Sequence, residues 1–160
     1  MVLTQGFIAG TVDNKSITLG REGSDYSAAI FSNILNVGAC YIWKDVPGLM
    51  NADPKAIPKA VLIDRISYGE AIELAYYGAK VIHHKTLKPL RNKKIPLFIK
   101  SFFNPDKNGT IIEEDFVESP VTSYIIKNNQ ILISISPKDY SFIGEDNLYK
   151  PVYSGAYSFG

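Results

Sequence analysis

Reactive and metal-binding side chains are scarce in this sequence, which has one cysteine and two histidines among 160 residues. Cys40 has no partner for an internal disulfide, and its apolar neighbours predict that it packs as a small hydrophobic side chain in a reducing compartment. No apolar run approaches the roughly 18 residues of a membrane-spanning helix, and the N-terminus lacks a charged segment followed by a long apolar one. The sequence therefore predicts a cytoplasmic protein that does not contact a membrane.

An excess of charge of one sign is also absent, because 17 basic and 16 acidic side chains give a formal net charge of +1. This balance gives no reason to expect nucleic acid as a partner. Basic residues do gather between Lys85 and Lys94, but without interleaved aromatic residues they are typical of a solvated helix face. His83 and His84 are adjacent rather than four residues apart, and no cysteine lies near them, so we predict no metal site.

Length and composition, with 46% hydrophobic residues, are those of a globular chain. A chain of this length removes roughly 68–70% of its unfolded surface from water, so it needs neither disulfides nor metals for stability. Residues 113–120 are acidic and without period, which predicts a linker. Residues 121–127 and 130–136 predict a hairpin or a broken strand pair that opens a second unit. We therefore expect one domain over residues 1–112, the linker over 113–120 and a truncated second unit over 121–160.

The chain is organised around residues 18–28, Thr-Leu-Gly-Arg-Glu-Gly-Ser-Asp-Tyr-Ser-Ala, where a strand leads through two glycines into a helix. Such a turn leaves backbone N–H groups unpaired at the positive end of the helix dipole, which favours an anion. Arg21 supplies a fork for a carboxylate or phosphate, Ser24 a hydroxyl, and Asp25 a charge that orients an ammonium group or a lysine. The alternative is that Ser24 or Asp25 merely caps the helix, and the residues alone leave this open.

The elements around this stretch predict a βαβ arrangement. Apolar runs at residues 7–10 and 16–19 predict two joined strands, and a period near 3.6 predicts a helix from about Tyr26 to Gly38. Residues 39–43 then predict a buried strand, and ligands of such sheets lie beyond the carboxyl ends of the strands. The residues predicted to share that rim are Arg21, Gly23, Ser24, Asp25, Lys44 and Asp45.

A long loop is predicted over residues 44–55, which are rich in Pro, Gly and Asn. Asp45 suits a hydroxyl or amine of a nucleotide, while Lys44 and Lys55 suit phosphate oxygens. The alternative is that the acidic residues form turns and the lysines are solvated.

The second half of the chain alternates helices and strands. Ser67 with Glu70 forms a capping box, and Gly78 ends the helix that follows. We predict a second, basic helix that runs to about Lys94, a strand over residues 95–102, a turn over 104–109 and a short strand over 110–112.

Four sequence blocks carry a specific resemblance over residues 5–112. In these blocks the chain resembles the aspartate kinases of the amino-acid kinase family, and residues from Ser119 onward resemble the start of an ACT regulatory domain. The blocks are residues 18–28, residues 42–48 with Ala-Asp-Pro at 52–54, residues 73–83, and Phe-Asn-Pro at 103–105 with Gly-Thr at 109–110.

The resemblance implies the C-terminal lobe of a carbamate kinase-like three-layer α/β/α fold, followed by an incomplete ACT-like, ferredoxin-like α+β segment. It implies phosphorylation of the L-aspartate side chain by ATP with Mg²⁺, the first step of lysine, threonine and methionine biosynthesis, in a homodimeric parent protein. By resemblance Asp25 is catalytic, and the substrate is bound by Arg21, Gly23, Ser24 and Asp25. The nucleotide positions are Lys44, Asp45, Met50, Lys55, Lys80 and Val81.

The chain departs from the family pattern at single positions and by the absence of one motif. Glu22 stands where glycine is common, and Lys44 stands where threonine or serine is common. The Lys-Phe-Gly-Gly-Thr phosphate loop of the family, with its catalytic lysine, does not occur in these 160 residues. We therefore expect the chain as given to be a fragment without meaningful turnover. The alternative, which is not an enzyme function, is a non-catalytic fragment that acts only as a nucleotide-binding or subunit-association module.

Overall fold

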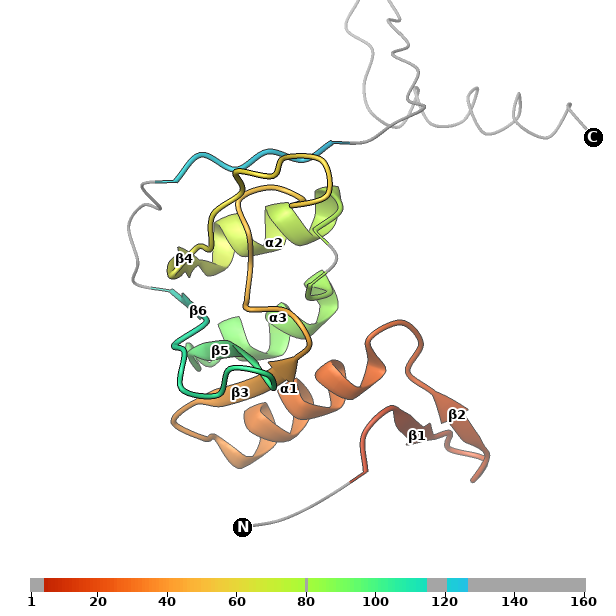
Figure 1. Ribbon diagram of the computed structural model, residues 1–160. Helices are drawn as coiled ribbons and strands as arrows, with labels where there is room; N and C mark the ends of the chain where they lie inside the picture. Colours follow the sequence, from red (N-terminus) through yellow and green to blue (C-terminus); the bar gives the residue numbers. More distant parts are fainter. Residues whose placement is uncertain (1–4, 80, 115–120, 127–160) are drawn as a thin grey trace, which may run out of the picture. The chain divides into compact units, whose positions relative to one another are not determined.

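The computed structural model describes residues 5–79, 81–114 and 121–126. Nine elements are assigned within these residues. In chain order they are β1 (Ile8–Gly10), β2 (Ser16–Thr18), α1 (Gly23–Leu35), β3 (Cys40–Lys44), β4 (Arg65–Ser67), α2 (Tyr68–Tyr77), α3 (His84–Arg91), β5 (Leu97–Ser101) and β6 (Thr110–Glu113) (Figure 1).

Four of the strands form one mixed sheet in the order β3-β5-β6-β4. β3 is parallel to β5, and β4 is parallel to β6, while β5 and β6 between them are antiparallel. The predicted strands over 39–43, 95–102 and 110–112 are confirmed with small shifts of their ends. β4 is not among the predicted strands, and its last residue, Ser67, is also the N-cap of α2.

Alternating side chains of the sheet strands enter the hydrophobic core. Cys40 and Ile42 of β3 are buried, as are Leu97 and Ile99 of β5, and they pack with buried residues of all three helices. α3 lies between α1 and α2 and contacts both (Figure 1). Burial therefore explains why these short strands form, since each contributes a row of apolar side chains to one shared core.

Tyr68 closes the core at the start of α2. It is fully buried, and its hydroxyl donates a hydrogen bond of 2.6 Å to the Ile95 carbonyl before β5. Burial, reinforced by the nearby Cys40 and Glu114, raises the pKa of Tyr68 far above its ordinary value, so the hydroxyl stays a donor.

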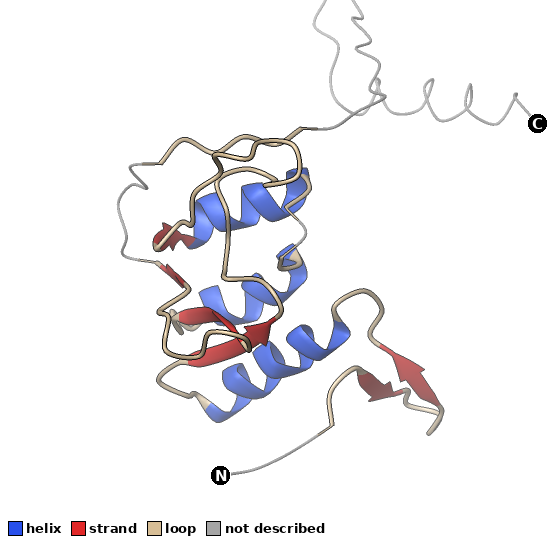
Figure 2. Cartoon of the chain, in the orientation of Figure 1, coloured by secondary structure: helices blue, strands red, loops and turns tan. Residues whose placement is uncertain are grey.

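The N-terminal strands β1 and β2 form the predicted antiparallel hairpin, drawn as two separate arrows beside α1 in Figure 2. A single side chain connects the residues before it to α1. Ser27 Oγ accepts a hydrogen bond from the Phe7 N–H at 3.0 Å and donates one to the Gly23 carbonyl at 3.0 Å. The segment that precedes the hairpin is therefore anchored to the first turns of α1.

The helix ends differ in how well the sequence predicted them. The capping box of α2 is confirmed, since Ser67 Oγ accepts from the Glu70 N–H while the Glu70 carboxylate accepts from the Ser67 N–H. The predicted bounds of α1 are wrong at both ends, because the helix starts at Gly23 and its C-cap is Asn36 in the left-handed conformation rather than Gly38. Neither Ser24 nor Asp25 is the N-cap, since that position is held by Glu22.

The predicted strand over residues 121–127 is not formed in its described part. Residues 121–126 have no regular structure, and they lie beside the loop after β3, where the Tyr124 N–H donates to the Asn51 carbonyl at 2.7 Å. The predicted linker at 115–120 and the rest of the ACT-like segment lie outside the described residues. Among the described helices, none is both long and apolar enough to cross a membrane.

Candidate active site

The turn between β2 and α1 contains two residues with positive φ. Gly20 has φ of +77°, and Glu22, the N-cap residue of α1, has φ of +55° without a side-chain cap on the first helical N–H groups. Gly23 is buried, and a Cβ there would lie 2.8 Å from Phe7 Cδ2 and 2.9 Å from Leu19 Cβ. Only glycine fits at this position, and the start of α1 therefore lies close to the residues that flank the hairpin.

An ion pair joins the first turn of α1 to the carboxyl end of β3. Lys44 Nζ lies 2.5 Å from Asp25 Oδ2, and the two side chains are only 19% and 12% exposed. The location of Asp25 in the first helical turn suits its negative charge, because the helix dipole is positive there. The prediction that residues 21–25 and Lys44 share one rim of the sheet is thus confirmed for this pair.

Arg21 and Ser24 lie on the same turn and are exposed. Arg21 makes no hydrogen bond or ion pair with any residue in the described part of the chain. A guanidinium group in this state keeps all its donors for a ligand. One oxygen of the neighbouring Glu22 carboxylate is buried without a hydrogen-bond partner among the described residues.

The loop after β3 carries three of the predicted nucleotide-binding residues. Asp45 follows Lys44 and is exposed. Met50 forms an isolated β-bridge with Leu62. Lys55 is exposed in a turn, where its N–H donates a hydrogen bond to Asp53 Oδ1 at 2.9 Å. Within the described residues, neither Met50 nor Lys55 makes a hydrogen bond or ion pair with the Asp25 carboxylate. Val81 packs against the core, and Lys80 lies outside the described residues.

Thr110 fixes this loop, a role that the sequence did not predict for it. Its buried hydroxyl accepts a hydrogen bond from the Leu49 N–H at 2.8 Å and donates one to the Ile63 carbonyl at 2.7 Å. Gly48 fits tightly against the same side chain, since a Cβ there would lie 2.5 Å from Thr110 Oγ1. The one available signal was the Gly-Thr pair that follows a predicted turn.

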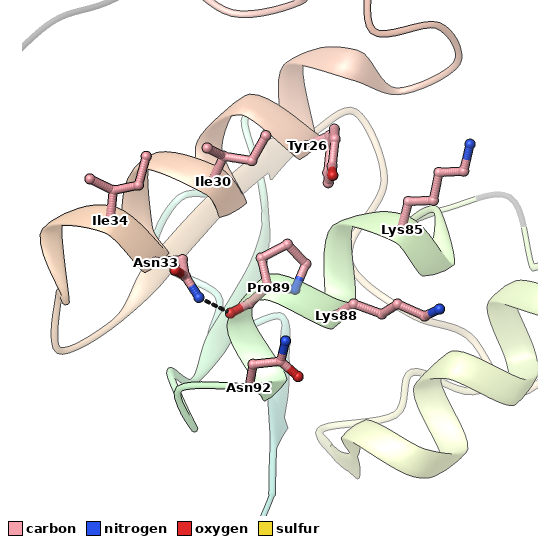
Figure 3. Close-up of a pocket in the computed structure, with 8 residues that line it drawn as sticks. All are labelled: Tyr26, Ile30, Asn33, Ile34, Lys85, Lys88, Pro89 and Asn92. Carbon is pink, nitrogen blue, oxygen red and sulfur yellow. Dashed lines mark hydrogen bonds between the residues drawn. The ribbon is translucent and has the colours of Figure 1, made fainter.

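A pocket between α1 and α3 lies beside the candidate site rather than in it. Figure 3 shows Tyr26, Ile30 and Ile34 on one wall and Lys85, Lys88 and Pro89 on the other, with Asn33 donating a hydrogen bond of 2.6 Å to the Pro89 carbonyl. It encloses about 330 Å³. Of the predicted site residues none lines it.

The two histidines lie at the start of α3, where His83 caps the helix. His83 is the N-cap of α3, where its Nδ1 accepts a hydrogen bond from the Lys85 N–H at 3.1 Å, and its ring lies 4.2 Å from that of His84. The pKa of His84 is lowered, first by partial loss of water and then by the positive neighbours His83, Lys85 and Lys88. No group of three or more His, Cys, Asp or Glu side chains that could hold a metal ion occurs in the described residues.

Comparison with known proteins gives this arrangement a context. The profile of the amino acid kinase family matches residues 1–101. The chain belongs to the amino acid kinase family. Its fold is also that of this family, because the chain superposes on crystalline Escherichia coli aspartokinase III, in complex with aspartate and ADP, with a TM-score of 0.68 and 41% identity. That superposition covers 71% of this chain and 25% of the E. coli chain.

Proteins of similar sequence within this family include aspartokinases. The chain is 46% identical over 124 residues to a bifunctional aspartokinase/homoserine dehydrogenase of Buchnera aphidicola, and 38% identical over 136 residues to the lysine-sensitive aspartokinase 3 of E. coli. These matches cover 74% and 84% of this chain. The chain spans 15% of the length of the first protein and 30% of the second.

Proposed function

We propose that this chain is part of an aspartate kinase, which transfers the terminal phosphoryl group of ATP to the side-chain carboxylate of L-aspartate. The observation that carries the proposal is the meeting of Asp25 and Lys44, which joins a predicted substrate-binding turn to a predicted nucleotide-binding strand end. The similarity to a solved aspartokinase that holds aspartate and ADP supports the same ligands.

The chemistry suits the side chains present. A carboxylate nucleophile is already ionised at neutral pH, so catalysis requires alignment and neutralisation of the phosphoryl charge rather than a strong base. Asp25 accordingly acts as a negative charge beside the reacting groups, on a backbone fixed by the first turn of α1. Mg²⁺ bound with the nucleotide supplies further neutralisation of the phosphates.

We assign roles to the remaining residues on the same basis. Arg21 is free of other described partners and holds the α-carboxylate of the amino acid, with Gly23 and Ser24 beside it. The nucleotide lies along the strand end and its loop, in contact with Lys44, Asp45, Met50, Lys55, Lys80 and Val81. A cytoplasmic location and a homodimeric parent protein belong to the same proposal.

Arg21→Ala tests the substrate assignment. We expect this change to weaken L-aspartate binding about 10- to 100-fold, because it removes charge-assisted hydrogen bonds to the α-carboxylate. Calorimetry on the 160-residue chain measures the affinity, with L-glutamate and D-aspartate as competing ligands. Arg91→Ala is the matched control, since Arg91 is exposed on α3 and pairs with Glu114. Equal L-aspartate affinity in the two variants would contradict the assignment.

Turnover is a separate question from binding. Coupled ADP release with ATP, Mg²⁺ and L-aspartate measures it, and the expectation that these 160 residues lack meaningful turnover stays a prediction. L-aspartate binding without turnover supports both the assignment and that expectation.

A second candidate function is that of a subunit-association module. The observation in its favour is β3, which pairs only with β5 among the described strands and exposes Tyr41 and Trp43 at 53% and 38%. Tyr41 stacks on Phe98 of β5 with ring centroids 4.6 Å apart, so an aromatic surface lies next to an unpaired strand edge.

Self-association tests this candidate. We expect the chain to form dimers or larger species in analytical ultracentrifugation, and we expect Tyr41→Ser to shift it toward monomer, because the change removes exposed aromatic area. Tyr76→Ser is the matched control, because Tyr76 is exposed on α2, away from the sheet. A wild-type chain that stays monomeric at about 0.1 mM would speak against association, since a specific dimer has a dissociation constant below this concentration.

A further inference from the structure

The ion pair between Asp25 and Lys44 is the direct contact between two predicted ligand sets. Asp25 belongs to the set around L-aspartate, and Lys44 belongs to the set around the nucleotide. Both backbones are fixed, since Asp25 lies in the first turn of α1 and the Lys44 carbonyl accepts a hydrogen bond from the Phe102 N–H at 2.9 Å beside β5. Any change in this contact is therefore a change of side-chain partner rather than of fold.

In the described part of the chain, no other charged side chain is paired with Asp25 or with Lys44. Lys44 is the cation that pairs with Asp25, while Arg21 points no donor at either residue and Lys100 lies over the Trp43 ring at 5.4 Å. The neighbouring residue Asp45 is exposed, and its carboxylate forms no ion pair with Lys44 in the described part of the chain. The Asp25 side chain is only 12% exposed, so its carboxylate would be poorly solvated if Lys44 left. The carboxylate would then bind another cation favourably.

We propose that the Asp25–Lys44 ion pair couples the binding of the two ligands, because phosphate draws Lys44 away from Asp25 and leaves that carboxylate for the ammonium group of the amino acid. This inference rests on the proposed function and adds to it a direction of coupling. Each ligand alone leaves one half-buried charge uncompensated, whereas the two ligands together satisfy both charges. The binding of ADP and L-aspartate is therefore mutually favourable.

Thermodynamic linkage makes the proposal measurable without turnover. Calorimetry gives the affinity of the 160-residue chain for ADP with and without saturating L-aspartate, and for L-aspartate with and without saturating ADP. We expect each ligand to tighten the binding of the other by about 10-fold, and the two ratios must agree because coupling is reciprocal.

Two substitutions separate the members of the pair. In Asp25→Asn, Lys44 has no competing carboxylate, so we expect ADP alone to bind more tightly than in wild type, L-aspartate to bind more weakly, and the coupling ratio to fall to about 1. In Lys44→Met, we expect ADP to bind more weakly and the ratio again to fall to about 1. Lys93→Met is the control, since Lys93 is exposed after α3, and its ratio should equal that of wild type.

The outcomes distinguish this inference from the proposed function. A chain that binds neither ligand overturns both. A chain that binds both ligands with no coupling, or whose coupling survives in Asp25→Asn or Lys44→Met, overturns the inference alone. Thermal unfolding of each variant shows that it is folded, and either substitution suffices if the other does not fold. A merely structural ion pair would change the melting temperature without the opposite shifts in ADP affinity.

Discussion

Gly109→Ala is expected to lower the free energy of unfolding by roughly 3 kcal/mol or more. Gly109 has φ of +71°, a region that residues with a side chain rarely adopt, and it immediately precedes β6 at the end of the turn from β5. A Cβ at this position would collide with the Ile99 carbonyl and contact Lys100 Cα, and backbone atoms of a central strand cannot move aside cheaply. Chemical denaturation followed by circular dichroism measures the loss.

Two other glycines separate the causes of that loss. Gly20 has φ of +77° with no heavy atom within 4 Å of its Cβ position, so Gly20→Ala carries the cost of the backbone conformation alone, about 1 kcal/mol. Gly10 has neither feature, so Gly10→Ala should change stability by less than about 0.5 kcal/mol. If Gly109→Ala were no worse than Gly20→Ala, the close approach of β5 to the turn would be refuted.

Thr110→Val is expected to lower the free energy of unfolding by roughly 2–4 kcal/mol, although the two side chains have nearly the same shape. The change leaves the Leu49 N–H and the Ile63 carbonyl without their partner in a region where Thr110 is fully buried. Hydrogen exchange of the Leu49 amide provides a local measurement, and we expect it to accelerate more than the exchange of amides in α2.

Thr18→Val is the control for this change, since Thr18 is exposed in β2 and its side chain makes no hydrogen bond with a described residue. It should be neutral or slightly stabilising, because valine favours strands. A Thr110→Val variant as stable as Thr18→Val would mean that the loop after β3 does not depend on this hydroxyl.

Local signals predicted the elements that carry their own stop and start residues. α2 is the best example, because Ser67, Glu70 and Gly78 lie within the segment that they delimit. The predicted start of α1 at Tyr26 lies after the observed start at Gly23, because the N-cap, Glu22, is a residue type that rarely caps a helix. The tight fit of Gly23 also depends on a tertiary contact with Phe7. β4 was missed since three residues carry no period and its partner β6 is distant in sequence.

The candidate site was predicted in part for a general reason. Residues that follow strands of an α/β sheet share one rim, and this rule predicts that Lys44 and the start of α1 lie close together. The rule does not predict which side chains on the rim contact each other, or which groups a buried hydroxyl binds. The Asp25–Lys44 contact and the two hydrogen bonds of Thr110 are tertiary facts of that kind.

The mixed order of the sheet sets an order of folding. β5 and β6 are joined by a short turn, so their antiparallel pairing closes a small loop, whereas Cys40 must find Leu97 and Arg65 must find Ile111 across long stretches of chain. Contacts of large sequence separation slow folding. We therefore expect the β5–β6 hairpin to be the early template and β3 to dock late, so that Lys44 reaches its final position near the end of folding.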